Sequence, residues 1–306
     1  MALDLSALTP YTDEQSSGLI KQILLNANTL ANNLVTVKYG VFGDTYKLNY
    51  VKSTVVGTNN LCNTTSAGST ILAQGTINLC PIDFYETLCL QDLKKVWYDL
   101  EMSRKYAPED LGTEAEIFAS NKVETTGLEI EKILWRGNKS TGSGNLALCD
   151  GFLATAAALT GETIVTIAAM TSSNAVAYID SIVAVAPESI LDKLEIYLSP
   201  RDFQLYLMDL NKNYKYNVAL MGTEKVQSIF HPGSIGTTVH SVAGLSGAPS
   251  GTFIATAKEN IVIAFGGDED INFDMYYSKD KKALVIDNNT KFGTGFYFPE
   301  LVIRSS

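Results

Sequence analysis

The chain has 306 residues and a mass of 33.2 kDa, enough for one large domain or two modest domains with sizeable cores. Its formal net charge is −10 and it has no dense run of Lys or Arg, which excludes tight binding of a nucleic-acid backbone over a broad surface. Charged residues make up only 18% of the chain. That fraction is low for a free soluble monomer and indicates that other subunits cover much of the surface, although a secreted β-protein has a similar composition.

Cysteine and histidine spacing gives no sign of a metal site. The chain contains no CxxC pair, which excludes the common zinc motifs, and its only residues of these two types are Cys62, Cys80, Cys89, Cys149, His231 and His240. The N-terminus has neither the charged nor the apolar region of a signal peptide. We therefore expect reduced, buried and inert thiols in a chain that folds in a cytoplasm. No stretch approaches the length of a transmembrane helix, so we expect no membrane contact.

The first two segments are predicted to be an arm and a hairpin. Residues 1–38 carry apolar residues at roughly helical spacing, loosened by Asn and Ser, and such a segment docks on a neighbour. In residues 39–82, "GDTYKLNYVKS" alternates and "TILAQGTINLCPI" is rich in Thr and Ile, with turn residues between them. This pattern predicts a long projecting hairpin. Two strands alone are marginally stable, so the hairpin needs a partner surface.

Two helices are expected next. The segment "LQDLKKVWYDLEMSRKY" predicts a helix over 90–106, and a longer helix over 114–136 is followed by Gly137, a typical stop. The middle of the longer helix has no large side chain on its apolar side, at Thr126 and Gly127, which would allow a sheet to cross close beneath it. We place its glutamates on a solvated or interface-facing side, with Lys122 and Lys132 among them: Glu114, Glu116, Glu124, Glu129 and Glu131.

The clearest α/β unit follows a flexible loop at 137–145. A strand in "ETIVTIA" leads to an amphipathic helix that starts near Ser173 and ends at Pro187. The alternating segment "KLEIYLS" predicts a buried strand. Ser199 is then a suitable N-cap, with Pro200 in the first position of another helix. From residue 218 onward the pattern is that of short strands and loops.

The acidic stretch "NIVIAFGGDEDINFDMYY", at 260–277, is the first candidate for chemistry. An EF-hand calcium loop needs a glycine at its sixth position, which "DEDINFDMYYSK" lacks. The letters also resemble the GGDEF signature of diguanylate cyclases, but no nucleotide-binding companion motif accompanies them. Apolar residues alternate on both sides of Gly266 and Gly267, which favours the tip of an ordinary hairpin over adventitious cation binding.

Motifs for catalysis are missing from the remaining sequence. GxSxG does not occur, the P-loop spacing GxxxxGK[ST] is absent from "GNKSTGSG", and neither histidine has an evident Ser or Cys partner. We interpret "GNKSTGSG" as a mobile loop and both histidines as surface or satisfied core residues. The sequence thus predicts no catalytic, cofactor-binding or metal-binding residue, no cofactor, and a protein that is not an enzyme.

The order of these elements resembles the major capsid proteins of tailed bacteriophages with the Hong Kong 97 fold. The helix "AEIFASNKVETTGLEIEKILWRGN" is similar to that family's spine helix, and "LCDGFLATA" to the step that follows it. "AVAYIDSIVAVAPESILDKLEIYLSPRDFQLYLMDLNKN" looks like the passage into the axial domain. "TFIATAKENIVIAFGGDEDINFD" and "GFYFPELVI" look like its closing strands. The resemblance spans nearly the whole chain, and it depends on order and spacing more than on any single motif.

The resemblance implies an α+β Hong Kong 97-type capsid fold with five parts. These are an N-terminal arm (1–38), an extended hairpin loop (39–82), a peripheral domain with a spine helix at 114–136 (83–187), an axial domain (188–250), and strands that return to both domains (251–306). Some relatives cross-link subunits through a Lys–Asn bond. Lys47 and Lys52 lie on the hairpin and Asn288 and Asn289 near the end of the chain, but no pair is singled out.

The implied function is a major capsid protein that self-assembles into the icosahedral shell around the DNA of a tailed phage. Its partners would be itself, in pentamers and hexamers, with portal, scaffold or decoration proteins as further candidates and packaged DNA in loose, non-specific contact. Its location would be the virion, after assembly in the host cytoplasm. The alternatives are an encapsulin-type nanocompartment shell and, from a different class, a β-rich ligand- or metal-binding domain or enzyme that uses the acidic turn.

Overall fold

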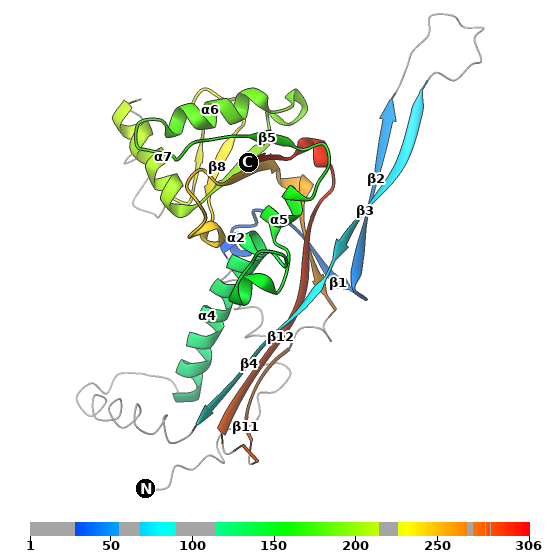
Figure 1. Cartoon of the computed structure of the whole chain (residues 1–306), viewed down its shortest axis with the longest axis vertical. Coiled ribbons are helices and arrows are strands. Elements are labelled where there is room, and N and C mark those ends of the chain that lie inside the picture. Colours follow the sequence, from blue (N-terminus) through cyan, green and yellow to red (C-terminus); the bar gives the residue numbers. More distant parts are fainter. Residues whose placement is uncertain are drawn as a thin grey trace, which may run out of the picture.

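The computed structural model describes residues 28–54, 68–89, 114–213, 226–267, 272–278, 280–281 and 283–306. Most of the expected arm, the tip of the expected hairpin and the helix expected over 90–106 lie outside these ranges. The described residues form two sheets with helices packed on them and one long strand pair that extends beyond the rest (Figure 1).

A five-stranded sheet is built around one long strand, β12. The order is β1-β10-β12-β11, and β4 pairs with β12 as well. The bounds are β1 Thr36–Val41, β4 Cys80–Cys89, β10 Ile261–Gly266, β11 Asn272–Ser278 and β12 Ala283–Phe296. Helix α4, Glu114–Arg136, packs against this sheet (Figure 1). The apolar side of α4 faces the sheet, because Val123, Ile130 and Ile133 are buried in one cluster with Phe292 of β12.

The prediction of a hairpin tip at Gly266–Gly267 is wrong. Strands β10 and β11 do not pair with each other; both run antiparallel to β12 along the same edge, opposite β4. Phe265 pairs with Phe292 and Asn272 with Asn289, so the acidic stretch 268–271 falls between two strands that each pair with β12. The hairpin is instead formed by β11 and β12, with Ser278 opposite Ala283. The prediction failed because apolar alternation identifies a strand without identifying its partner.

The second sheet has six strands in the order β5-β13-β9-β6-β8-β7. Their bounds are β5 Thr163–Val165, β6 Leu194–Leu198, β7 Ser228–Phe230, β8 Thr238–Ser241, β9 Phe253–Ala257 and β13 Ile303–Ser305. Helices α6, Ala175–Val185, and α7, Pro200–Asn213, share a core with this sheet. The expected boundary at 187/188 does not follow this packing. Strand β5 lies before that boundary yet belongs to the six-stranded sheet, and helix α6, also before it, buries Val176, Ile179 and Ile182 in the core of that sheet.

Buried side chains accept backbone hydrogen bonds at both helix starts in this layer. The backbone N–H of Asp202 donates to Ser199 Oγ at 3.1 Å, as expected for an N-cap at the start of α7. The side chain of Asp209 accepts a hydrogen bond from the N–H of Val176, at 2.8 Å, in the first turn of α6. Asp202 also accepts from the N–H of Gly251 at 3.0 Å. These contacts lock α6, α7 and the loop before β9 together.

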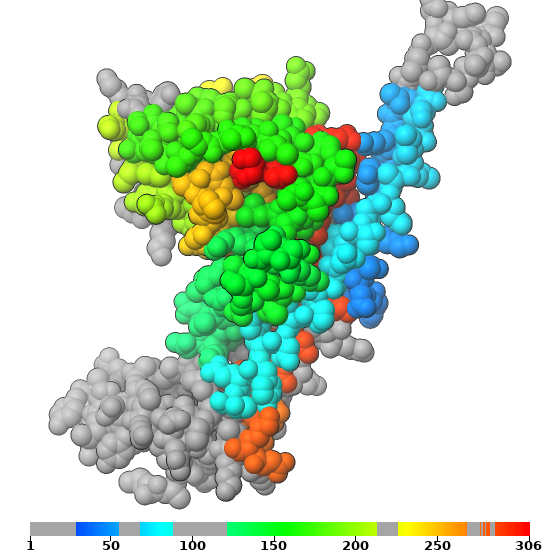
Figure 2. Space-filling view, in the orientation of Figure 1, coloured from blue at the N-terminus to red at the C-terminus, as the bar shows by residue number. Residues whose placement is uncertain are grey.

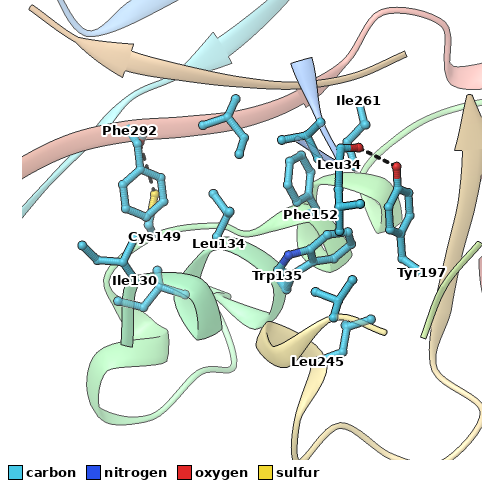
Figure 3. Packing of buried hydrophobic residues seen from close by; sticks show 14 of the residues in the cluster. Leu34, Ile130, Leu134, Trp135, Cys149, Phe152, Tyr197, Leu245, Ile261 and Phe292 are labelled. Carbon is cyan, nitrogen blue, oxygen red and sulfur yellow. Dashed lines mark hydrogen bonds between the residues drawn. The ribbon is translucent and has the colours of Figure 1, made fainter. Parts of the chain in front are cut away.

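The two sheets meet around Trp135, the penultimate residue of α4 (Figure 3). Its ring lies 5.0 Å from that of Phe152 and 5.1 Å from that of Tyr197, and all three side chains are fully buried. Short elements line this junction: α2 Asn28–Ala31, η2 Gly144–Ala147, α5 Phe152–Ala157 and η5 Ala243–Leu245. Three more single turns, η3 Glu188–Ile190, η6 Lys258–Asn260 and η8 Pro299–Leu301, connect strands elsewhere.

Two of the four cysteines form a disulfide, which corrects the expectation of free thiols. Cys80, at the start of β4, is bonded to Cys149, in the loop before α5, with their Cα atoms 5.8 Å apart. Both are buried, and the bond joins the first residue of a sheet strand to the segment that follows α4. The spacing of 69 residues carries no signal of this pairing in the sequence, because it is produced by the packing of α4 on the sheet.

Candidate functional site: the projecting hairpin and the domain junction

The two strands predicted within 39–82 pair with each other over ten residues each. Strand β2, Thr45–Thr54, runs antiparallel to β3, Ser69–Asn78 (Figure 1). One face of this ribbon packs on the rest of the subunit near its base, where Leu48 and Ile77 are buried. Figure 2 shows the remainder extending past the body of the molecule. The base of the hairpin is therefore held by its own chain, and in its far half residues 51–54 and 69–72 are all exposed.

Three contacts mark where the hairpin leaves the body. The ring of Tyr50 lies edge-on to that of Phe298, with centroids 5.2 Å apart. Lys52 forms an ion pair with Glu300 of η8, and Lys291 of β12 pairs with Asp44 at 3.0 Å. Because ion pairs between exposed groups contribute little, the buried side chains at the base supply most of the attachment.

The outer face of the hairpin presents an apolar pair within a polar ladder. Val51 lies directly opposite Leu72, and their side chains are 56% and 81% exposed. Gln74 Nε2 donates to Asn49 Oδ1 at 2.7 Å on the same face, one pair nearer the body. Large apolar side chains at the end of a rigid ribbon are typical of an interaction surface.

The hairpin also differs from the rest of the chain in charge. Residues 45–82 contain Lys47 and Lys52 and no Asp or Glu. The rest of the chain, outside residues 45–82, contains all 33 acidic residues and 21 of the 23 basic residues. Its formal charge is therefore 21 − 33 = −12. A basic extension on an acidic body is electrostatically complementary to the body of another copy.

Exposed aromatic side chains also lie at strand β1, which pairs with β10 on the side of the five-stranded sheet away from β4. Tyr39 is 65% exposed and stacks on Phe265 with ring centroids 5.6 Å apart. Phe42, just after the strand, is 87% exposed and lies against Gly267. The two rings are the most exposed aromatic side chains among the described residues.

Glu131 corrects the expectation that every glutamate of the long helix faces solvent or an interface. Its side chain is only 1% exposed and lies at the junction of the two sheets. Thr29 Oγ1 donates to Glu131 Oε1 at 2.5 Å, and the N–H groups of Thr29 and Gly244 also point at the carboxylate. Burial raises the pKa of the Glu131 carboxyl, against the lowering effect of these hydrogen bonds. Helical periodicity could have found it, since Glu131 follows Ile130 and precedes Ile133 on the apolar side.

Glu195, Tyr197 and His240 form a second buried polar group, on β6 and β8. The hydroxyl of Tyr197 lies 2.6 Å from Glu195 Oε2, and the ring of His240 stacks on that of Tyr197 at 5.5 Å. Burial raises the pKa of Glu195 and lowers that of His240 to about 4. His240 Nε2 lies 3.7 Å from Glu195 Oε2, too far for a hydrogen bond. Because the pKa of His240 is about 4, its ring is neutral at pH 7, so this contact is not an ion pair.

His231, the other histidine, has two side-chain partners and no nucleophile beside it. Its Nε2 lies 2.8 Å from Asp180 Oδ1 and its Nδ1 lies 2.8 Å from the hydroxyl of Tyr206. Tyr206 is fully buried, so no substrate reaches its hydroxyl. This arrangement ties the loop after β7 to α6 and α7 and is a structural contact.

The loop at 137–145 offers no phosphate site, because its backbone donors are already used. Asn138 Oδ1 accepts hydrogen bonds from the N–H groups of Ser140 and Thr141, and the N–H of Lys139 donates to Asp150. Across the described ranges no three His, Cys, Asp or Glu side chains gather as metal ligands. None of the helices in the same part of the chain is long and apolar enough to cross a membrane.

No family model and no curated protein matches the chain. Solved structures do match it over almost its full length. A virus-like particle from Pyrococcus furiosus is 10% identical, covers 97% of this chain and 99% of its own, and has a TM-score of 0.55. Mycobacterium phage Ogopogo is 15% identical with 89% and 90% covered and a TM-score of 0.57. The satellite phage P4 procapsid is 9% identical with 94% and 98% covered and a TM-score of 0.54. The chain therefore has the Hong Kong 97-type capsid fold, as its order of elements predicted.

Proposed function

We propose that this chain is the major capsid protein of a tailed bacteriophage and self-assembles into the icosahedral shell around the DNA genome. The observation that carries the proposal is the match of about nine tenths of the chain or more to phage capsid structures. The exposed outer face of the hairpin supports it, since Val51 and Leu72 are positioned to be buried by another subunit.

The proposed assembly places the six-stranded sheet and its helices around each pentamer or hexamer axis. The hairpin crosses onto a neighbouring subunit, and the basic charge of residues 45–82 favours that acidic neighbour. An acidic subunit holds packaged DNA loosely, because few cations are available to neutralise phosphates. Portal, scaffold and decoration proteins are further partners in the proposal, the virion is its location, and the host cytoplasm is where it assembles.

We also propose that the protein has no enzymatic role. The neighbours in structure are shell proteins. The polar groups buried at the junction, around Glu131 and Glu195, are enclosed by protein and contact backbone and aromatic groups of the chain itself. The encapsulin-type alternative has the same architecture and differs in its cargo. The several phage capsids among the structural neighbours favour the phage shell.

Electron microscopy of the purified protein tests the proposal. We expect closed particles from the wild type, and unassembled but folded subunits from Leu72→Asp or Val51→Asp, because a carboxylate cannot be buried without a partner. Thr76→Asp is a matched control, with the same charge on the same strand and face but nearer the attached base. Only monomers and dimers of wild type under all assembly conditions would refute the shell. Particles filled with a protein cargo in place of DNA would favour the nanocompartment.

A further inference from the structure

The segment that precedes β1 is buried between the two sheets. Thr29 is fully buried in α2, and Leu34 and Val35 are 7% and 1% exposed. The turn between them has Asn33 in the left-handed region, at φ 51°. Thr29, Leu34 and Val35 therefore belong to the core at the junction, while residues 31–33 between them are exposed. The sequence had predicted that the whole of 1–38 is an arm that docks on a neighbour.

A chain of hydrogen bonds ties this segment to helix α4 and to η5. Trp135 Nε1 donates to Thr29 Oγ1 at 2.7 Å, so the Thr29 hydroxyl has its own proton free to donate to Glu131. The N–H of Thr29 lies 3.3 Å from both carboxylate oxygens, and the N–H of Gly244 also donates to them. Glu131 thus touches α2, its own helix and η5, the three elements that meet where the sheets join.

Among the residues that the structure describes, no cation lies opposite this carboxylate. The elements packed against it, Asn28–Ala31 and Ala243–Leu245, contain no titratable or charged side chain. On its own helix, Lys132 Nζ donates to Glu129 at 2.6 Å and Arg136 Nη1 to the carbonyl of Ser246 at 2.5 Å. Only three dipolar donors, two from Thr29 and one from Gly244, compensate the buried charge.

We propose that Thr29, Glu131 and Gly244 form a proton-sensitive clasp through which residues 28–35 control how firmly the two sheets are joined. When the clasp is closed, the segment bridges α4, which packs on the five-stranded sheet, and η5, which follows a strand of the six-stranded sheet. When it opens, the junction loses that bridge. The inference concerns the folded subunit and stands whether or not the subunit forms a shell.

The direction of the effect follows from linkage. In the closed state the pKa of Glu131 is raised above that of a glutamate in water. The closed state therefore binds the proton more tightly than any open state, so acid favours closing and the clasp weakens as pH rises through the raised pKa. Each pKa unit between the two states changes the closing equilibrium tenfold.

The far end of the segment provides a fixed reference. Tyr197 on β6 lies 2.7 Å from the carbonyl oxygen of Leu34, and this contact does not involve Glu131 (Figure 3). Opening of the clasp is therefore expected to expose the Thr29 end first, beside the Trp135 ring. Trp135 is a suitable spectroscopic reporter of this opening. The chain has only two tryptophans, so Trp135 is the single tryptophan of a Trp97→Phe variant.

The experiment is a pH titration of the near-UV circular dichroism of Trp135, in unassembled full-length Trp97→Phe protein between pH 4 and pH 9. We expect a reversible transition with a midpoint above 4.5. Glu131→Gln has the size of the protonated residue and no charge, so it should abolish the transition. Thr29→Val removes a hydroxyl that lowers the pKa and should move the midpoint to higher pH. Hydrogen exchange of residues 28–35, corrected for intrinsic rates, should show protection falling over the same range in wild type and remaining level in Glu131→Gln.

Each outcome either supports or contradicts the clasp. A Trp135 transition that persists in Glu131→Gln, or a midpoint that Thr29→Val leaves unchanged or lowers, would overturn the clasp. Absence of any transition in wild type would do the same. If Glu131→Gln fails to fold, comparison of Thr29→Val with Thr29→Ser still tests the assignment. Thr29→Ser keeps the hydroxyl and should keep the wild-type midpoint. Because unassembled subunits are measured, failure to form particles leaves this result unaffected.

Discussion

The hydroxyl oxygen of Tyr197 lies 2.7 Å from the carbonyl oxygen of Leu34, which is 163 residues away, and 2.6 Å from a carboxylate oxygen of Glu195. The Tyr197 hydroxyl is the donor in both contacts, so its single proton is shared between the Leu34 carbonyl and the Glu195 carboxylate. The contact attaches the segment before β1 to the six-stranded sheet.

Tyr197→Phe tests that attachment. Removing the hydroxyl leaves the buried carbonyl of Leu34 without this donor, so we expect a loss of about 1–3 kcal/mol in the free energy of unfolding. The measurement is thermal or denaturant unfolding of the purified chain. Tyr276→Phe, at a tyrosine that is 44% exposed, is the control and should be neutral. Equal stability of the two variants would show that the Leu34 contact contributes nothing.

Because Cys80 and Cys149 form a disulfide, we expect the free energy of unfolding to depend on redox state. The bond closes a loop over a sequence separation of 69 residues, for which the chain-entropy model gives roughly 4 kcal/mol. We expect Cys80→Ser, Cys149→Ser and the double variant to lose the same stability, because either single change already removes the bond. Reductant should lower the melting temperature of wild type only. Additive losses in the double variant would contradict a native bond.

The sequence predicted most elements and few of their partners. Period-3.6 and period-2 patterns located α4, α6, α7 and β6, because each of these elements buries one face. Pairing depends on contacts far apart in the chain, so the patterns on either side of Gly267 suggested a hairpin where β12 in fact pairs with both strands. The Cys80–Cys149 bond and the partner of Glu131 were missed for the same reason, although helical periodicity alone places Glu131 on the apolar side of α4. Each is explained only by an element that arrives from elsewhere, α2 for Glu131 and the start of β4 for Cys149.

Gly244 is a position where no side chain fits. A Cβ built there would lie 2.4 Å from the carbonyl oxygen of Glu131 and 2.4 Å from Trp135 Cδ1, which no rotamer change can relieve on the backbone side. We expect Gly244→Ala to force η5 away from α4 and to destabilise the chain by about 1–3 kcal/mol or more. Gly75→Ala is the matched control, since its nearest contact would be an ordinary 3.6 Å. Unfolding midpoints of the two variants that coincide would show that η5 is not packed against α4 in solution.

Because the pKa of His240 is lowered, we expect the protein to lose stability in acid, and one substitution should remove this loss. Its pKa is lowered to about 4, first by burial and then by Lys258, so between pH 6.5 and 4 the unfolded chain binds a proton that the folded chain does not. The stabilisation is complete above pH 6.5 and is lost as pH falls toward 4, by roughly 3 kcal/mol from that difference. The raised pKa values of Glu131 and Glu195 act in the opposite direction, so the comparison must be made between variants.

His240→Phe isolates that contribution. Neither ring nitrogen of His240 has a hydrogen-bond partner among the described residues, and the ring stacks on Tyr197, so phenylalanine keeps the packing and loses no bond. We expect the variant to equal or exceed wild type in stability at pH 7 and to lose less stability on acidification to pH 4. Urea unfolding at a series of pH values measures both quantities. Parallel pH curves for the two proteins would mean that His240 titrates normally and is not buried as the structure places it.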